Sequence, residues 1–238
     1  AVAAITPGNS VRRLLFRKGE TWTSPSPGLL NSNGPGIIGA FGAGGSPVIQ
    51  RTGGTRIISV SSGNTPDLAD WRIMDLELNG LGAPGATFAG VGTLGGMNQL
   101  TLLRLNVHDV GVGFSFTSSV LNFNNLGGGA TPGHDIYDQV AFVDNTVTSV
   151  LNPSGGNGIF VEATKLMVMG NTISDSTNGE HILRIQSVVK GVISNNSLSN
   201  QGALKSVLTL RANAFSAGPC ANVTGCGYSE QAVISDNT

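Results

Sequence analysis

Charged and polar side chains recur at alternate positions in two neighbouring hydrophobic segments near the end of the chain. Arg184 belongs to the first segment and Arg211 to the second. Alternate residues of a β-strand point to the same side of a sheet. If the two segments are adjacent strands, both guanidinium groups therefore lie on one outer surface. The other members of this polar group are Glu180, His181, Gln186, Lys205 and Thr209.

Cations held this close repel one another, so an anion is expected among them. Arginine binds a carboxylate through two parallel hydrogen bonds. A uronate sugar bound by Arg184 and Arg211 would lose the proton next to its carboxylate more easily, and Lys205 would remove that proton. This chemistry is β-elimination across a glycosidic bond. The other interpretation is a set of solvated charges in which Glu180 pairs with Lys205 or Arg184, with little energetic consequence.

A repeated asparagine phrase predicts the elements that must hold these residues. The asparagines at 145, 171, 196 and 237 are 26, 25 and 41 residues apart, and a Thr or Ser follows each. A period of this size with the same corner residue is typical of stacked β-coils, in which the amides form a ladder. The usual hand of such connections predicts a right-handed parallel β-helix of about eight or nine coils.

The asparagine column also predicts which side chains face the core. Counting back equal distances from Asn171 and Asn196 aligns Phe160 with Ile185, and the next coil adds Leu210. These three apolar residues are predicted to stack inward. The positions predicted to point outward are Ile159, Val161, Arg184, Gln186, Thr209 and Arg211.

The 238 residues are expected to form one elongated all-β domain. No segment keeps apolar residues at helical spacing over three turns, and 35 glycines fit short strands joined by many turns. Residues 1–50 are predicted to form an N-terminal cap and the first coils. Residues 51–238 are predicted to form the regular coils of what we expect to be a longer chain. Loops inserted between coils are predicted at 80–98, 126–133 and 212–230.

The overall composition excludes some partners and suggests a location. A formal net charge of −1 gives no general attraction to nucleic acid, and no run of 18 apolar residues predicts a membrane span. Cys220 and Cys226 lie six residues apart in a loop rich in Gly, Pro and Asn, which favours a local disulfide over two free thiols. A disulfide predicts a secreted, periplasmic or cell-surface protein.

Three motifs in the polar region resemble those of a known family. They are Gly-Glu at 179–180, Asn-Asn-Ser-Leu at 195–198 and Leu-Thr-Leu-Arg at 208–211. In this order they resemble the chondroitinase B and alginate lyase family of polysaccharide lyases, which has a pectin-lyase-like β-helix. The residues at 14–21 also look like the opening of many secreted β-helix lyases. The resemblance covers about 35 residues and implies that Arg211 lies on the leaving-group side.

The chain departs from this family at two functional positions. The family's second glutamate, which helps to hold calcium, corresponds to Ile182, so Glu180 alone remains as a ligand. The family's base lysine corresponds to Ser187. Calcium is therefore not a firm expectation, and no other cofactor is implied. The nearest replacements for the base are Lys205 and Lys190, with Lys205 preferred because it shares the strand face of Arg211.

Taken together, these features predict a secreted enzyme that cleaves an acidic polysaccharide as a lyase. One alternative is a non-catalytic β-helix, such as an adhesin, a tailspike-like stalk or a surface assembly module, which would associate with itself end to end or side by side. A further alternative is a glycoside hydrolase that uses Asp135 and Asp138. The predicted catalytic residues are Lys205 and Arg211, and the predicted substrate contacts are Glu180, His181, Arg184, Gln186 and Thr209.

Overall fold

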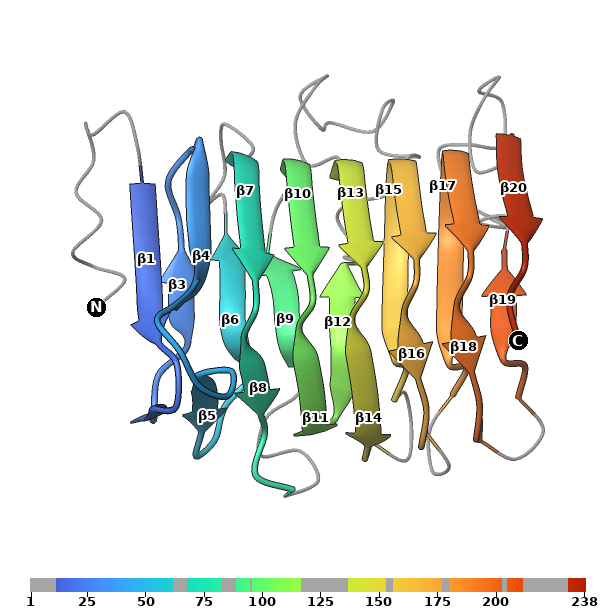
Figure 1. Cartoon of the computed structure of the whole chain (residues 1–238). Helices are drawn as coiled ribbons and strands as arrows, with labels where there is room; N and C mark the ends of the chain where they lie inside the picture. Colours follow the sequence, from blue (N-terminus) through green and yellow to red (C-terminus); the bar gives the residue numbers. More distant parts are fainter. Residues whose placement is uncertain are drawn as a thin grey trace.

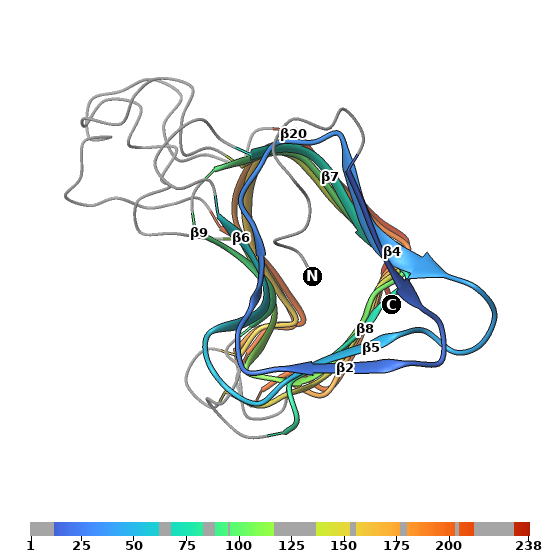
Figure 2. The same cartoon turned by 90° about the vertical axis from the view of Figure 1, so that its left-hand side faces the viewer.

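The computed structural model shows a chain of β-strands wound into successive coils along one axis (Figure 1). Seen from the N-terminal end, each coil runs clockwise as the chain recedes, so the solenoid is right-handed (Figure 2). Neighbouring coils are joined by parallel strand pairs. This confirms the predicted single-domain, right-handed parallel β-helix. The structure describes residues 12–61, 68–82, 89–94, 96–116, 137–152, 156–176, 180–202, 205–211 and 231–238.

Each coil contributes strands to three faces, and the first face lies at the front of Figure 1. It consists of β1 (Arg12–Arg17), β4 (Gly36–Phe41), β7 (Leu68–Met74), β10 (Met97–Leu103), β13 (Tyr137–Val143), the second halves of β15 (Ile159–Met169) and β17 (Leu183–Ser194), and β20 (Gln231–Ser235). Because these strands succeed one another in register, the described chain forms eight coils, within the predicted range.

The second and third faces complete each coil. The second face consists of β2 (Thr21–Ser24), β5 (Val48–Arg51), β8 (Glu77–Asn79), β11 (Asn106–Val110), β14 (Thr146–Val150), β16 (Thr172–Ile173) and β18 (Ser197–Leu198). The third face consists of β3 (Gly28–Leu30), β6 (Arg56–Ser61), β9 (Ala89–Leu94), β12 (Val112–Phe116), the first halves of β15 and β17, and β19 (Leu208–Leu210).

The predicted asparagine ladder is present where the first face turns into the second. The Asn145 amide donates to Asn171 Oδ1 at 2.9 Å, Asn171 donates to Asn196 at 2.9 Å, and Asn196 donates to Asn237 at 2.8 Å. Each amide also donates to a backbone carbonyl of the preceding coil, for example Asn171 to Phe142 at 3.0 Å. The ladder therefore satisfies buried polar groups that would otherwise be unpaired.

Left-handed backbone geometry at this corner belongs to the residue before each ladder asparagine. A short polar side chain or glycine tolerates this geometry at low cost. The φ values are 52° at Asp144, 71° at Gly170, 55° at Asn195 and 53° at Asp236. In this two-residue phrase, the first residue makes the turn and the second forms the hydrogen bonds between coils.

The core consists of apolar columns that run along the solenoid axis. Leu102, Phe142, Val168 and Ile193 are register partners in four successive coils, and all four are fully buried. The Phe142 ring packs against Phe114 with 5.4 Å between ring centroids. Burying side chains of this size contributes about 1.5–3 kcal/mol each, which makes the columns the main source of stability.

The register of the third face corrects one prediction. Val161, not Phe160, pairs with Ile185, and Phe160 pairs with Arg184. Val161 and Ile159 are fully buried in the core, whereas they were predicted to point outward. The physical reason is a β-bulge at Gln186, which adds one residue to the later coil, so equal counting from the asparagines fails by one position.

A column of glycines explains why part of the segment predicted as a loop at 80–98 is strand, while residues 83–88 and 95 lie outside the described residues. Strand β9 occupies residues 89–94, and β10 begins at Met97. A Cβ atom at Gly90 would overlap Val107, and one at Gly158 would overlap Ile173. Glycine is therefore needed here for close packing of the third face on the second, not for a loop.

Several predictions fall outside the described residues. They are the inserted loops at 126–133 and 212–230, the cysteines Cys220 and Cys226, and Asp135. The disulfide and the extracellular location inferred from it stay predictions. In the part of the chain that the structure describes, no helix is long and apolar enough to cross a membrane.

Candidate functional site

The predicted polar residues meet on the outer surface of the third face, where β15, β17 and β19 lie side by side. Phe160, Arg184 and Thr209 occupy one register row across these strands. The Arg184 guanidinium lies over the Phe160 ring, with 4.5 Å between Cζ and the ring centroid. This cation–π contact holds the arginine close to the sheet. Arg211 follows β19 and is exposed.

The two arginines influence each other, and Arg184 has unused hydrogen-bonding capacity. Burial lowers the pKa of Arg184, and the charge of Arg211 lowers it further. Both Arg184 Nε and Thr209 Oγ1 are buried and lack a hydrogen-bond partner among the described residues. Buried polar atoms are normally paired. The surface thus presents a donor and a hydroxyl that an anionic ligand would satisfy.

Lys205 does not stand free on this surface. Its ammonium pairs with Glu180 Oε2 at 2.9 Å. The lysine is the main cause of the lowered pKa of Glu180, to which Arg184 and His181 also contribute. The predicted base is therefore engaged in the ion pair that the alternative interpretation named.

His181 is buried rather than placed to meet a ligand. Its Nδ1 accepts a hydrogen bond from the Ser206 backbone N–H at 2.9 Å, and the side chain has an exposed fraction of 9%. Burial lowers the pKa of His181, and the charges of Arg211 and Arg184 lower it further. A hydrogen bond from the protonated ring to the Ser206 carbonyl oxygen, 3.2 Å from Nδ1, opposes them. A neutral imidazole that braces the turn before β19 fits these contacts. Gln186, at the bulge beside Glu162, is half-buried.

Glu162 is the functional candidate that the sequence analysis missed. It follows Val161 in β15 and precedes Ala163, and both of these side chains are in the core, so strand alternation directs Glu162 outward. It is nevertheless only 5% exposed. Burial raises the pKa of Glu162 to about 8, and its Oε2 has no hydrogen-bond partner among the described residues. The sequence feature that could have indicated Glu162 is a single carboxyl residue within an otherwise apolar stretch of strand.

Asp138 lies one coil before Glu162 and has the opposite electrostatic environment. Although burial alone would raise the pKa of Asp138, hydrogen bonds from Thr164 and Gln139 and the ammonium of Lys165 lower it overall. Thr164 donates to Asp138 Oδ1 at 2.6 Å. Thr164 is two residues after Glu162, and two residues of strand span about 6.6 Å. The Asp138 carboxylate therefore lies on the order of 8 Å from the Glu162 backbone.

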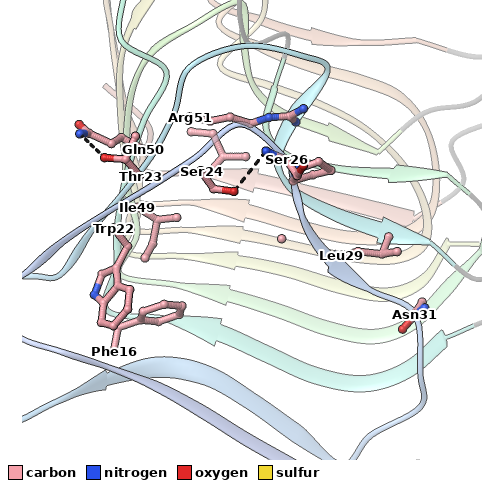
Figure 3. Close-up of a pocket in the computed structure, with 13 residues that line it drawn as sticks. Phe16, Trp22, Thr23, Ser24, Ser26, Leu29, Asn31, Ile49, Gln50 and Arg51 are labelled. Carbon is pink, nitrogen blue, oxygen red and sulfur yellow. Dashed lines mark hydrogen bonds between the residues drawn. The ribbon is translucent and has the colours of Figure 1, made fainter. Parts of the chain in front are cut away.

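Two other places in the molecule are less suited to chemistry. A cavity of about 470 Å³ opens at the N-terminal end, lined by Phe16, Trp22, Gln50 and Arg51 among others (Figure 3). None of the residues that line it carries a carboxyl group, and its apolar lining continues the core. His108, on the second face, bonds Asp109 at 2.7 Å and Glu77 at 3.1 Å, which links two coils.

The departures from the family pattern left calcium without a firm basis, and the described residues do not add one. Within the described ranges, no three His, Cys, Asp or Glu side chains are grouped to hold a metal ion. Glu180, the ligand retained from the family pattern, is paired with Lys205 instead.

The fold and this surface define a right-handed parallel β-helix with a buried carboxyl group on the same face as an arginine pair. No protein-family model and no curated protein sequence matches the chain. Among solved structures, GH136 lacto-N-biosidase from Eubacterium ramulus, as its selenomethionine derivative, aligns with a TM-score of 0.52 and 13% identity over 89% of this chain and 51% of that one. The native protein aligns with a TM-score of 0.34 and 12% identity over 100% of this chain and 64% of that one.

These comparisons correct the predicted activity. The chain spans about half the length of the first of these structures, and the likeness at 13% identity shows a shared fold. That neighbour is a glycoside hydrolase, so the prediction of a polysaccharide lyase is wrong. The engaged state of Lys205 agrees with this correction, since a general base needs a free lone pair.

Proposed function

We propose that this chain binds a glycan across the outer third face and hydrolyses a glycosidic bond, with Glu162 as the proton donor. The observation that carries the proposal is a buried carboxyl group with an unpartnered oxygen, one coil from an ionised carboxylate. Glycoside hydrolysis uses two carboxyl groups in these two protonation states. The fold shared with a solved glycoside hydrolase supports the same reaction class.

The two carboxyl groups have separate roles. At neutral pH Glu162 keeps its proton, because its pKa is raised to about 8, and it donates that proton to the departing glycosidic oxygen. Asp138 stays ionised and takes a proton from the water that attacks the sugar carbon. The net reaction adds water across one carbon–oxygen bond. Glu180 is a poorer partner, since it lies seven residues before Ser187, the register partner of Glu162, and pairs with Lys205.

The arginine pair favours an acidic sugar as part of the ligand. Arg184 and Arg211 add two positive charges to the same face as Glu162, and Glu180, the carboxylate whose charge acts on Arg184, is already paired with Lys205. A sugar carboxylate would accept hydrogen bonds from Arg184 Nε and Thr209 Oγ1, which are unsatisfied buried atoms able to donate. The ligand class is thus a glycan that carries a carboxylate next to the cleaved bond.

Replacing Glu162 by glutamine is expected to lower the hydrolysis rate by about 10²–10⁴-fold, because the amide cannot donate the proton. Replacing Asp138 by asparagine is expected to lower it by a similar factor. The measurement is the release of reducing ends from a panel of neutral, sialylated and uronate-containing oligosaccharides. Asp175→Asn is the matched control, since Asp175 is an exposed carboxylate at a turn that is not part of the third face. Full activity in Glu162→Gln would disprove the assignment.

Replacing Arg211 by glutamine is expected to weaken binding of the acidic glycan about tenfold, because one charge-assisted contact is lost. Affinity would be measured by calorimetry on the Glu162→Gln background, so that no substrate is consumed. The control is Arg72→Gln, an exposed arginine of the first face. Equal weakening for a neutral glycan of the same length would contradict an acidic-sugar subsite while leaving the hydrolase assignment intact.

A further inference from the structure

The first face carries an apolar surface that the fold does not require. Residues of β10, β13, β15 and β17 that alternate with the core columns point outward. Met167 and Val192 are each 40% exposed, and their neighbours are half-buried against one another. We name this set the apolar stripe, and its members are Leu103, Ala141, Val143, Met167, Met169 and Val192.

The second face shows that outward positions of this solenoid accept polar residues. There the outward residues of the corresponding coils are Thr146 and Thr148, Thr172 and Ser174, and Ser197 and Ser199. Both faces belong to the same coils and have the same strand spacing. The stripe is therefore a property of the first face alone, and a contiguous exposed apolar surface marks an interaction site.

The size of the first face suits a partner of similar shape. From β4 to β20 there are seven strands, about 4.8 Å apart, and each has about six residues of 3.3 Å, which gives a face of roughly 600–700 Å². A stable interface buries about 800 Å² on each partner. Two flat sheets pack face to face about 10 Å apart, so the first face of a second copy would cover the apolar stripe along its length.

Charges along the two edges of the stripe specify how such a pair is oriented. Exposed Lys165 and Lys190 lie where the strands enter the first face, with Lys165 paired to Asp138. Exposed Asp144 and Asp236 lie where the strands leave it, on the edge where Arg104 and Asp75 pair with each other. A twofold axis parallel to the solenoid axis reverses the strand direction of the second copy and leaves its coils at the same positions along the axis. The edge with Lys165 and Lys190 then faces the edge with Asp144 and Asp236 of the other copy. A twofold axis along the strands would place lysine opposite lysine, which is repulsive.

We propose that two copies of this chain associate through their first faces, side by side, with parallel solenoid axes and antiparallel strands. The apolar stripes are buried at the centre, and Lys190 of one copy lies beside Asp236 of the other. Glu162, Arg184 and Arg211 lie on the third face outside this interface, whereas Asp138, at the start of β13, lies at its edge.

Sedimentation velocity of the full chain between ~1 and ~100 μM tests this inference. The expected result is a reversible monomer–dimer equilibrium. Val192→Glu is expected to weaken association at least 50-fold, because a charge would be buried at the centre of the interface. Thr172→Glu places the same charge on the second face and is expected to leave the equilibrium unchanged. Circular dichroism melting shows whether each variant is folded.

A charge exchange tests the orientation. Lys190→Glu is expected to weaken the dimer, and adding Asp236→Lys is expected to restore it. Arg104 already occupies the corner position equivalent to Asp236 with a φ of 50°, so a long basic side chain fits there. A chain that stays monomeric at all concentrations overturns the inference. Association that survives Val192→Glu also overturns it, because the copies would then meet elsewhere, for example end to end.

Discussion

Replacing Glu162 by glutamine is expected to raise the free energy of unfolding, relative to the wild type, by roughly 4–5 kcal/mol more at alkaline pH than at pH 4. Folding raises the pKa of Glu162 from 4.5 to about 8. Below pH 4.5 the carboxyl group is protonated in both the folded and the unfolded chain, so its ionisation does not yet reduce the free energy of unfolding. Between pH 4.5 and 8 the unfolded chain releases the proton and the folded chain retains it. The wild-type free energy of unfolding therefore falls as pH rises.

The measurement is urea denaturation of both proteins at intervals from pH 4 to pH 9. Subtracting the wild-type free energy of unfolding from that of Glu162→Gln cancels the titration of the other groups. The difference should rise by about 1.4 kcal/mol for each pH unit until about pH 8 and then level off. Glu20→Gln, at an exposed glutamate, is expected to show no such rise. A flat difference for Glu162→Gln would mean that the carboxyl is hydrated in the folded protein.

The same substitution thus has opposite expected effects on stability and on hydrolysis. A carboxyl group that is buried without a partner is costly to keep, and such cost is typical of catalytic positions. Loss of activity together with gain of stability at pH 8 would distinguish a proton donor from a residue that merely supports the fold. A structural residue would lose both together.

Replacing Asn171 by alanine is expected to destabilise the protein by about 3–6 kcal/mol. Asn171 is 1% exposed and lies in the middle of the ladder. Its Oδ1 accepts from the Asn145 backbone N–H at 3.0 Å, and its amide donates to Asn196 and Phe142. Alanine would leave two or three buried polar groups unpaired, each costing about 1–3 kcal/mol.

Thermal and urea unfolding at pH 5 measure this effect at a pH where Glu162 remains protonated in the folded state. Thr172→Ala is the matched control, because Thr172 is the next residue and points to solvent. It is expected to change the free energy of unfolding by less than about 0.5 kcal/mol. If Asn171→Ala were no more costly than Thr172→Ala, the ladder would not contribute to stability, and the apolar columns alone would hold the coils together.

The leucines in the coils before the ladder show why the cost of replacing a ladder asparagine depends on its position. Leu76 and Leu105 occupy the same corner position in the two coils before Asn145. The backbone N–H of Leu105 donates to Asn145 Oδ1 at 2.9 Å, so the first asparagine already satisfies it. Within the ladder each asparagine depends on the next one, and an apolar side chain there would interrupt the chain of hydrogen bonds.

Much of the fold was predictable because it rests on local repetition. The asparagine phrase predicted the corner and the ladder. Val140, Leu166 and Gly191, each five residues before a ladder asparagine, are register partners as equal counting requires. It also placed Arg184 beside Thr209. These predictions succeeded because each corner has the same geometry, so equal distances from it lead to equal positions.

Prediction failed where packing between coils adds or removes a residue. The bulge at Gln186 shifted Phe160 from the core to the outer surface, next to Arg184. The glycines of β9 looked like a loop, although they allow two faces to approach each other. Nothing local marks either feature, because both depend on the neighbouring coil.

The sequence by itself determined the architecture of this protein, a parallel β-helix whose asparagine ladder sets the register of its later coils. It also identified the arginine pair, since strand alternation alone places Arg184 and Arg211 outward. Only the tertiary structure decided the chemistry. Whether a carboxyl group keeps its proton depends on how completely the folded chain removes it from water, and residues distant in sequence determine that. Glu162 and Asp138 therefore became a pair only when the coils were stacked.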